Sequence, residues 1–156
     1  MTPTELMQLA IDKCREGIAA GQSPFGCAIG KDDRIIAVCH NTVVATTDIT
    51  AHAEINAVRH GCREIGDIFL DGCVVATTCE PCPMCMAALH WARVSKVYFG
   101  ATIADAETAG FNELQLPADE IVRIGGSPVE LECGLLADQC KLLFDEWVNS
   151  PNPQRY

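Results

Sequence analysis

Two short motifs, about thirty residues apart, constrain the fold of this chain more than any other feature. Residues 50–54 read T-A-H-A-E, and residues 79–85 read C-E-P-C-P-M-C. Each motif lies where a helical stretch is expected to begin. Backbone N–H groups at a helix N-terminus favour negative charge, lower thiol pKa values and so favour thiolates as metal ligands. A fold that uses both motifs brings two helix starts to one point.

The spacing in the second motif predicts metal ligands. Cys82 and Cys85 can bind one tetrahedral ion from a first helical turn, and Pro83 between them is well suited to begin that helix. His52 as a third ligand leaves one position for water, which distinguishes a catalytic zinc site from a structural one. Cys79 has the same spacing to Cys82, but we expect it to end the preceding strand and face elsewhere. The alternative is Cys79 as a fourth ligand, which closes the site.

Glu54 extends this pattern from a metal site to a reaction. It lies two residues after His52, where its carboxylate can reach water on the metal. The alternative is a carboxylate that only interacts with the helix dipole. However, H-x-E followed by P-C-x-x-C is the signature of zinc deaminases, in which the Glu is the general acid and base. The sequence therefore predicts one zinc ion per chain, held by His52, Cys82 and Cys85, with Glu54 moving protons.

The remaining periodicity predicts an α/β fold. Helices are expected over residues 3–20, 51–62, 83–92 and 135–148. Strands are expected over residues 25–30, 35–43, 73–77, 94–100 and 129–132, the first two as a hairpin. Residues 101–128 read as irregular, and the tail 150–156 as extended. This alternation predicts a sheet sandwiched between helices.

The length and the charge of the chain restrict the number of domains and the kinds of binding partner. The 156 residues fit a single domain, 1–156. Residues 101–156 hold ten acidic and three basic residues, within a net charge of −10. Because nucleic-acid binding gains most of its affinity from Lys and Arg, this balance favours a small, weakly charged substrate over nucleic acid.

No secretory signal and no bilayer-spanning segment can be identified, so we expect a cytoplasmic protein without membrane contacts. Most of the ten cysteines lie beside apolar residues. In a reducing compartment these are small buried hydrophobic residues rather than disulfide partners.

At the two motifs, and also at Pro24-Phe25-Gly26 and His40-Asn41, the chain resembles the cytidine-deaminase-like superfamily. One histidine with two cysteines resembles the branch of cytosine, guanine, deoxycytidylate and tRNA adenosine deaminases. The resemblance implies a three-layer α/β/α sandwich with a central mixed five-stranded sheet, a zinc cofactor and a homodimer.

Within that branch the chain is most similar to bacterial guanine deaminases and their guanosine-deaminase relatives. Residues 79–85, 90–93 and 104–111 carry this similarity, as does Arg155-Tyr156, which resembles an aromatic C-terminus that closes over its own or a partner's active site. The resemblance implies base contacts from Phe25, Asn41, Ala53, Trp91, Glu113 and Tyr156. On their residues alone, Phe25 and Trp91 could be core aromatics, Asn41 a turn cap and Glu113 a solvated acid.

One departure concerns the substrate. The family usually has Phe-Asp-Asp where this chain has Phe111-Asn112-Glu113, and the second Asp reads the guanine edge. Glu113 keeps the charge and adds a methylene group, which changes the depth of the pocket or the substrate.

The function expected from the resemblance is hydrolysis of guanine to xanthine and ammonia, with water as co-substrate, in purine metabolism. Three alternatives stay open. The first is tRNA adenosine deamination, because residues 134–140 resemble those enzymes. The second is deamination of another small base, such as cytosine, guanosine, isocytosine or a triazine. The third is a non-catalytic zinc module, which leaves Glu54 without a role.

Overall fold

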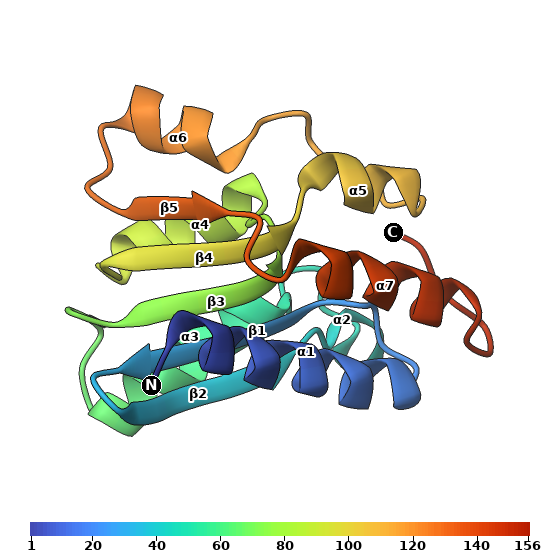
Figure 1. Cartoon of the computed structure of the whole chain (residues 1–156), viewed down its shortest axis with the longest axis horizontal. Coiled ribbons are helices and arrows are strands. Elements are labelled where there is room, and N and C mark those ends of the chain that lie inside the picture. Colours follow the sequence, from blue (N-terminus) through green and yellow to red (C-terminus); the bar gives the residue numbers. More distant parts are fainter.

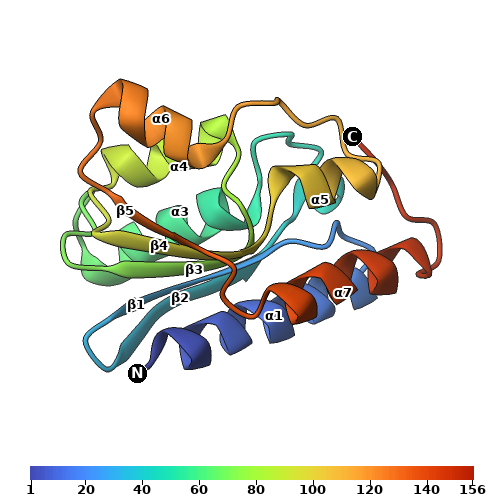
Figure 2. The same ribbon diagram turned by 45° about the horizontal axis from the view of Figure 1, so that its top comes forward.

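A computed structural model describes all 156 residues and shows the expected α/β/α sandwich. The central sheet has five strands in the order β2-β1-β3-β4-β5. The strands are β1 (Gly26–Lys31), β2 (Arg34–His40), β3 (Val74–Cys79), β4 (Lys96–Ala101) and β5 (Glu130–Cys133). The helices are α1 (Pro3–Ala19), α2 (Val43–Thr46), α3 (Ala53–Ile65), α4 (Pro83–Trp91), α5 (Ile103–Thr108), α6 (Ala118–Gly125) and α7 (Ala137–Val148). Helices α1 and α7 cover one face of the sheet, and α3 and α4 cover the other (Figures 1 and 2).

The strand directions bring the sequence motifs to one edge of the sheet. β1 runs antiparallel to β2 and β3, whereas β3, β4 and β5 are parallel to one another. Gly26 at the start of β1 therefore lies at the same edge as His40, Cys79 and Ala101, which end β2, β3 and β4. The segments that follow those three strand ends all begin at this edge.

Neighbouring residues of a strand face opposite sides of the sheet, so successive residues belong to two different core clusters. Cys27, Ile29 and Val75 pack in the cluster with α3 and α4, whereas Ala28 and Ala76 pack in the cluster with α1 and α7. Burial on both faces explains why β1 and β3 consist mostly of apolar residues.

Gly26 lets α1 approach the sheet closely. A Cβ atom at this position would collide with the carbonyl oxygen of Ala10 in α1.

None of the helices combines the length and apolar character needed to cross a bilayer.

Two expectations about local structure are wrong. The second strand ends at His40 instead of residue 43, because the Asn41 side chain accepts a hydrogen bond from the Val43 N–H at 3.0 Å and turns the chain into α2. Residues 101–128 are not irregular throughout, since they contain α5 and α6. Helix α5 begins with a capping box between Thr102 and Asp105.

Candidate active site and metal centre

The two motifs lie at the starts of two helices, as expected from the sequence. His52 is the N-cap residue of α3 and Cys82 that of α4, and both have extended backbone angles. Pro83 is the first residue of α4, and its fixed φ angle suits that position. Cys85 follows in the first turn of α4, and Glu54 lies in the first turn of α3.

His52, Cys82 and Cys85 form one compact group of potential ligands. The His52 Nδ1 atom lies 3.6 Å from the Sγ atom of each cysteine, and the three donor atoms lie within 4.8 Å of one another. One imidazole nitrogen and two sulfurs form a donor set that suits zinc, and three protein ligands leave a position for water. The chemistry of the group therefore fits one zinc ion.

Cys79 lies outside this group. Its side chain is buried in the cluster on the α1 and α7 side of the sheet, and its thiol donates to the carbonyl oxygen of Thr102 at 3.5 Å. It ends β3, as the sequence analysis expects, and its sulfur cannot complete a closed four-ligand site from there.

The helix start favours the thiolate form of Cys82. Its pKa is lowered to about 4, first because the Cys85 thiol donates to its sulfur, and further by hydrogen bonds from His52 and from the Cys85 N–H. A thiolate at this position is the form that binds a metal ion.

Glu54 lies directly beside the ligand group. Its side chain is 5% exposed, and its Oε2 atom lies 3.5 Å from the Sγ atom of Cys85. The hydroxyl of Thr77 donates to the other carboxylate oxygen, Oε1, at 3.0 Å. Burial raises the pKa of Glu54, and the charge of Cys82 raises it further. A raised pKa makes a carboxylate a stronger base, which suits a group that accepts protons during a reaction.

Thr77 was missed by the sequence analysis. It occupies a fully buried position in β3, and the signal that could have identified it is the pair of threonines, Thr77 and Thr78, within an otherwise apolar strand. Its hydroxyl also lies 3.3 Å from the carbonyl oxygen of Gly26.

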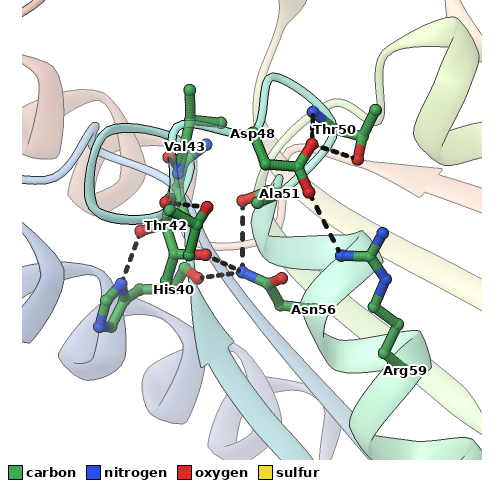
Figure 3. A network of polar contacts seen from close by, with 10 residues as sticks. His40, Thr42, Val43, Asp48, Thr50, Ala51, Asn56 and Arg59 are labelled. Atoms are coloured by element: carbon green, nitrogen blue, oxygen red, sulfur yellow. Dashed lines mark hydrogen bonds and ion pairs between the residues drawn. The ribbon is translucent and has the colours of Figure 1, made fainter.

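The loop that leads into His52 is held by a network of side chains (Figure 3). The Asn56 amide donates to the carbonyl oxygens of His40 and Ala51 and to the hydroxyl of Thr42, at 2.9 to 3.2 Å. Because Asn56 belongs to α3, it ties the end of β2 and the residue before His52 to the helix that His52 begins.

A second part of the network closes the loop itself. The Asp48 carboxylate accepts hydrogen bonds from the N–H and hydroxyl of Thr50, at 2.9 and 2.7 Å (Figure 3). Arg59 of α3 lies 3.9 Å from the other oxygen of Asp48. Both contacts restrict the backbone two residues before His52.

The structure brings several of the expected base contacts close to the ligand group. Asn41 is fully buried and donates from Nδ2 to the hydroxyl of Tyr156 at 2.6 Å. The ring of Tyr156 lies 6.1 Å from the ring of His52, and Ala53 is the first residue of α3. The pKa of Glu113 is raised to about 7, first by burial and then by the charge of Cys82.

The two other expected contacts lie differently. Phe25 packs edge-to-face on Phe111, whose ring in turn lies 5.5 Å from Tyr156, so it supports the tail that reaches the site. Trp91 is 77% exposed and ends α4, whereas Cys85 lies in the first turn of that helix. Trp91 lines a separate surface hollow with Phe69 and other residues, so the structure does not bring it together with the other predicted contacts.

Comparison with known proteins agrees with this geometry. Residues 1–101 match the family of the cytidine and deoxycytidylate deaminase zinc-binding region. A guanine deaminase of Bacillus subtilis is 42% identical over 127 residues, which cover 77% of this chain and 81% of that protein. A tRNA-specific adenosine deaminase of Aquifex aeolicus is 38% identical over 95 residues, covering 61% of this chain and 63% of the relative.

A solved structure of a guanine deaminase from Nitrosomonas europaea has the same architecture. It matches with a TM-score of 0.85 and 29% sequence identity, over 94% of this chain and 84% of that one. The family match covers both motifs, and its zinc-binding description agrees with the His52, Cys82 and Cys85 group. The chain therefore belongs to the cytidine and deoxycytidylate deaminase family, and it is a zinc-dependent hydrolytic deaminase.

Proposed function

We propose that this protein hydrolyses guanine to xanthine and ammonia. The observation that carries the proposal is the buried Glu54 carboxylate beside His52, Cys82 and Cys85, with Asn41 and Tyr156 hydrogen-bonded to each other near the same group. The similarity to guanine deaminases directs the choice of base.

In this proposal His52, Cys82 and Cys85 hold one zinc ion. When bound, zinc supplies a Lewis acid that makes a water molecule nucleophilic at neutral pH. Glu54 would take a proton from the attacking water and pass it to the ring nitrogen beside the amino-bearing carbon, while the hydroxide adds to that carbon. Glu54 would then take the remaining proton of the added hydroxyl and pass it to the amino group, so that the C–N bond breaks, ammonia leaves and a ring carbonyl forms. Thr77 keeps the Glu54 carboxylate oriented throughout, through its hydrogen bond to Oε1.

The polar side chains near the ligand group select the base. Asn41 offers an amide and Tyr156 a hydroxyl, and both can bond to the polar edge of a purine. Glu113 accepts from ring N–H or amino groups in its charged form and donates in its protonated form, and a pKa of about 7 makes both forms accessible. Ala53, at the start of α3, provides a small side chain beside the base.

An ammonia-release screen tests the substrate. The zinc-loaded protein is given guanine, guanosine, cytosine, adenosine, isocytosine and an aminotriazine, each at the same concentration. We expect the highest kcat/KM with guanine. Turnover of another base without guanine turnover contradicts the specific proposal but leaves the deaminase chemistry in place.

A second candidate is deamination of adenosine in tRNA, which the similarity to tRNA-specific adenosine deaminases favours. The ten acidic residues of 101–156 oppose it, because they repel a polyanion. Incubation with unmodified tRNA, followed by sequencing for inosine, distinguishes the two functions. The guanine proposal expects no inosine and no salt-dependent tRNA binding.

The assembly and location belong to the same proposal. We infer a single-domain protein that forms a homodimer, as the family resemblance implies, and analytical ultracentrifugation measures this directly. All ten cysteines are free thiols, a state that a reducing compartment such as the cytoplasm maintains.

A further inference from the structure

Glu80 connects the metal-binding motif to a distant segment of the chain. It lies between Cys79 and Cys82, and its side chain is half-buried. Its Oε2 atom accepts a hydrogen bond from the N–H of Ile103 at 3.0 Å, and its Oε1 atom accepts one from the N–H of Ala118 at 2.8 Å. These two residues are the first residues of α5 and α6, so one carboxylate binds the starts of two helices.

Each helix start favours such a partner. The first N–H groups of a helix have no acceptor within the helix, and the helix dipole attracts negative charge there. The N-cap residue of α6 is Pro117, which makes no side-chain cap. Glu80 therefore supplies the side-chain acceptor that the first residue of α6 otherwise lacks.

The segment between the two helices carries groups of the active site. Residues 109–117 run from the end of α5 to the start of α6 and include Phe111 and Glu113. Phe111 packs against Phe25 and Tyr156, and the pKa of Glu113 responds to the charge of Cys82. Apart from backbone hydrogen bonds to α5 and α6 at its two ends, the segment is bonded to the tail, through the Asn112 N–H and the Ala109 carbonyl oxygen.

We propose that Glu80 is a positioning residue for substrate selection. By binding both helix starts, it holds residues 109–117 in register with Cys82, which lies two positions after it. The distance between Glu113 and the metal centre is thereby set by the metal-binding motif itself. This inference rests on the proposed function, in which Glu113 contacts the base.

The chemistry of the side chain determines the useful variants. Glu80→Gln keeps the size and one acceptor oxygen, but its amide group cannot accept from the second N–H, so one helix start loses its partner. Glu80→Ala removes both acceptors. Glu107→Gln is the matched control, because Glu107 is an exposed acid of α5 with no side-chain hydrogen bond in the structure, and the charge change is the same.

Kinetics and zinc content form the first measurement. For Glu80→Gln we expect one zinc per chain, a KM for guanine raised about tenfold through loss of one charged hydrogen bond, and a smaller change in kcat. The preference for guanine over isocytosine also decreases, and Glu80→Ala shows a larger effect in the same direction. Glu107→Gln retains the wild-type values. Loss of zinc in Glu80→Gln overturns the proposal, because it assigns Glu80 to the metal centre instead.

Hydrogen exchange of the substrate-free protein forms the second measurement. We expect faster exchange over residues 103–118 in Glu80→Gln, with unchanged exchange in α3 and α4. Unchanged exchange together with an unchanged KM overturns the proposal. If the wild type does not turn over guanine, the proposed function fails, whereas the exchange result still decides the role of Glu80 in holding the segment.

Discussion

The metal-binding group and the wall that we propose faces the substrate are built in different ways. The donors come from two short motifs, each at the first turn of a helix that packs on the sheet. The wall comes from the turn at Asn41, the segment around Glu113 and the tail at Tyr156. The ligand group is therefore local in sequence, whereas the wall depends on contacts between distant parts of the chain.

This difference separates the residues that carry out the reaction from those that select the substrate. Regular elements hold side chains more precisely than loops do, which suits a group that binds a metal. Loops tolerate substitution better, which suits the part of a site that changes with the substrate. Variants of the ligand group should therefore abolish the reaction, whereas variants of the wall should change KM and base preference.

The largest effect is expected from the two ligand cysteines. Cys82→Ser and Cys85→Ser each remove a thiolate from the group, and we expect them to lose zinc and all measurable deamination. Atomic absorption of the purified variants gives zinc per chain. Cys79→Ala is the control, because the Cys79 sulfur lies outside the group, and it should keep one zinc per chain. Loss of zinc in Cys79→Ala would show a closed, four-ligand site.

The next effect concerns the carboxylate. Glu54→Gln keeps the shape of the side chain but cannot take a proton from water, so kcat should decrease on the order of 10³-fold with zinc retained. Ammonia release and zinc content are measured on the same sample. Glu64→Gln, at an exposed position of the same helix, should match the wild type. Near-normal turnover in Glu54→Gln would remove Glu54 from the mechanism.

We expect a smaller loss of activity when a residue of the substrate wall is replaced. Tyr156→Phe deletes the hydroxyl that accepts from Asn41 at 2.6 Å. We expect kcat/KM to decrease about tenfold, mainly through KM, because the loss leaves a buried amide without its partner. Tyr98→Phe, on β4 and outside the site, is the matched control. A change in kcat alone would place the Tyr156 hydroxyl in the chemical step instead.

The smallest effect concerns the loop before His52. Hydrogen bonds from the hydroxyl and N–H of Thr50 lower the pKa of Asp48. A lowered pKa stabilises the fold above the unfolded value of about 3.9, and this stability is lost as the pH falls through the lowered value. Asp48→Asn should slightly reduce Tm at pH 7 and flatten the dependence of Tm on pH below about pH 4. An unchanged dependence on pH would mean that the pKa of Asp48 is the same in the folded and unfolded states. Asp71→Asn at an exposed position provides the reference.

The sequence was sufficient for the ligand group and the layer order. His52, Cys82 and Cys85 were predictable because helix starts can be recognised locally, and the strands because their apolar residues form continuous runs. Helix α5 is short, and its capping box between Thr102 and Asp105 is the local signal that could have identified it. Helix α6 was harder to predict, since its start has no side-chain cap of its own and depends partly on Glu80, far away in the sequence. Thr77 was not predictable either, because its contact with Glu54 depends on how α3 packs against β3.

The contact of Trp91 with the base stays a prediction, because within one chain this residue lies apart from the ligand group. The local sequence around it is similar to guanine deaminases, yet the side chain ends α4 and is exposed away from the ligand group. Similarity of neighbouring residues along the chain does not determine where a side chain points, because that direction depends on the position of the residue in the helical turn.

The Thr77 hydroxyl has one hydrogen atom but two acceptors in reach, Glu54 Oε1 and the carbonyl oxygen of Gly26. While Glu54 is charged, that hydrogen points to the carboxylate. Once Glu54 carries a proton on Oε1, its O–H can donate to Thr77, and the threonine hydrogen turns to the strand carbonyl. Rotation about a single C–O bond thus keeps the Thr77 hydroxyl hydrogen-bonded to the Glu54 carboxyl in both states. The carboxyl can gain and lose protons during each catalytic cycle without displacement of a heavy atom, so little reorganisation energy is added to the proton transfers.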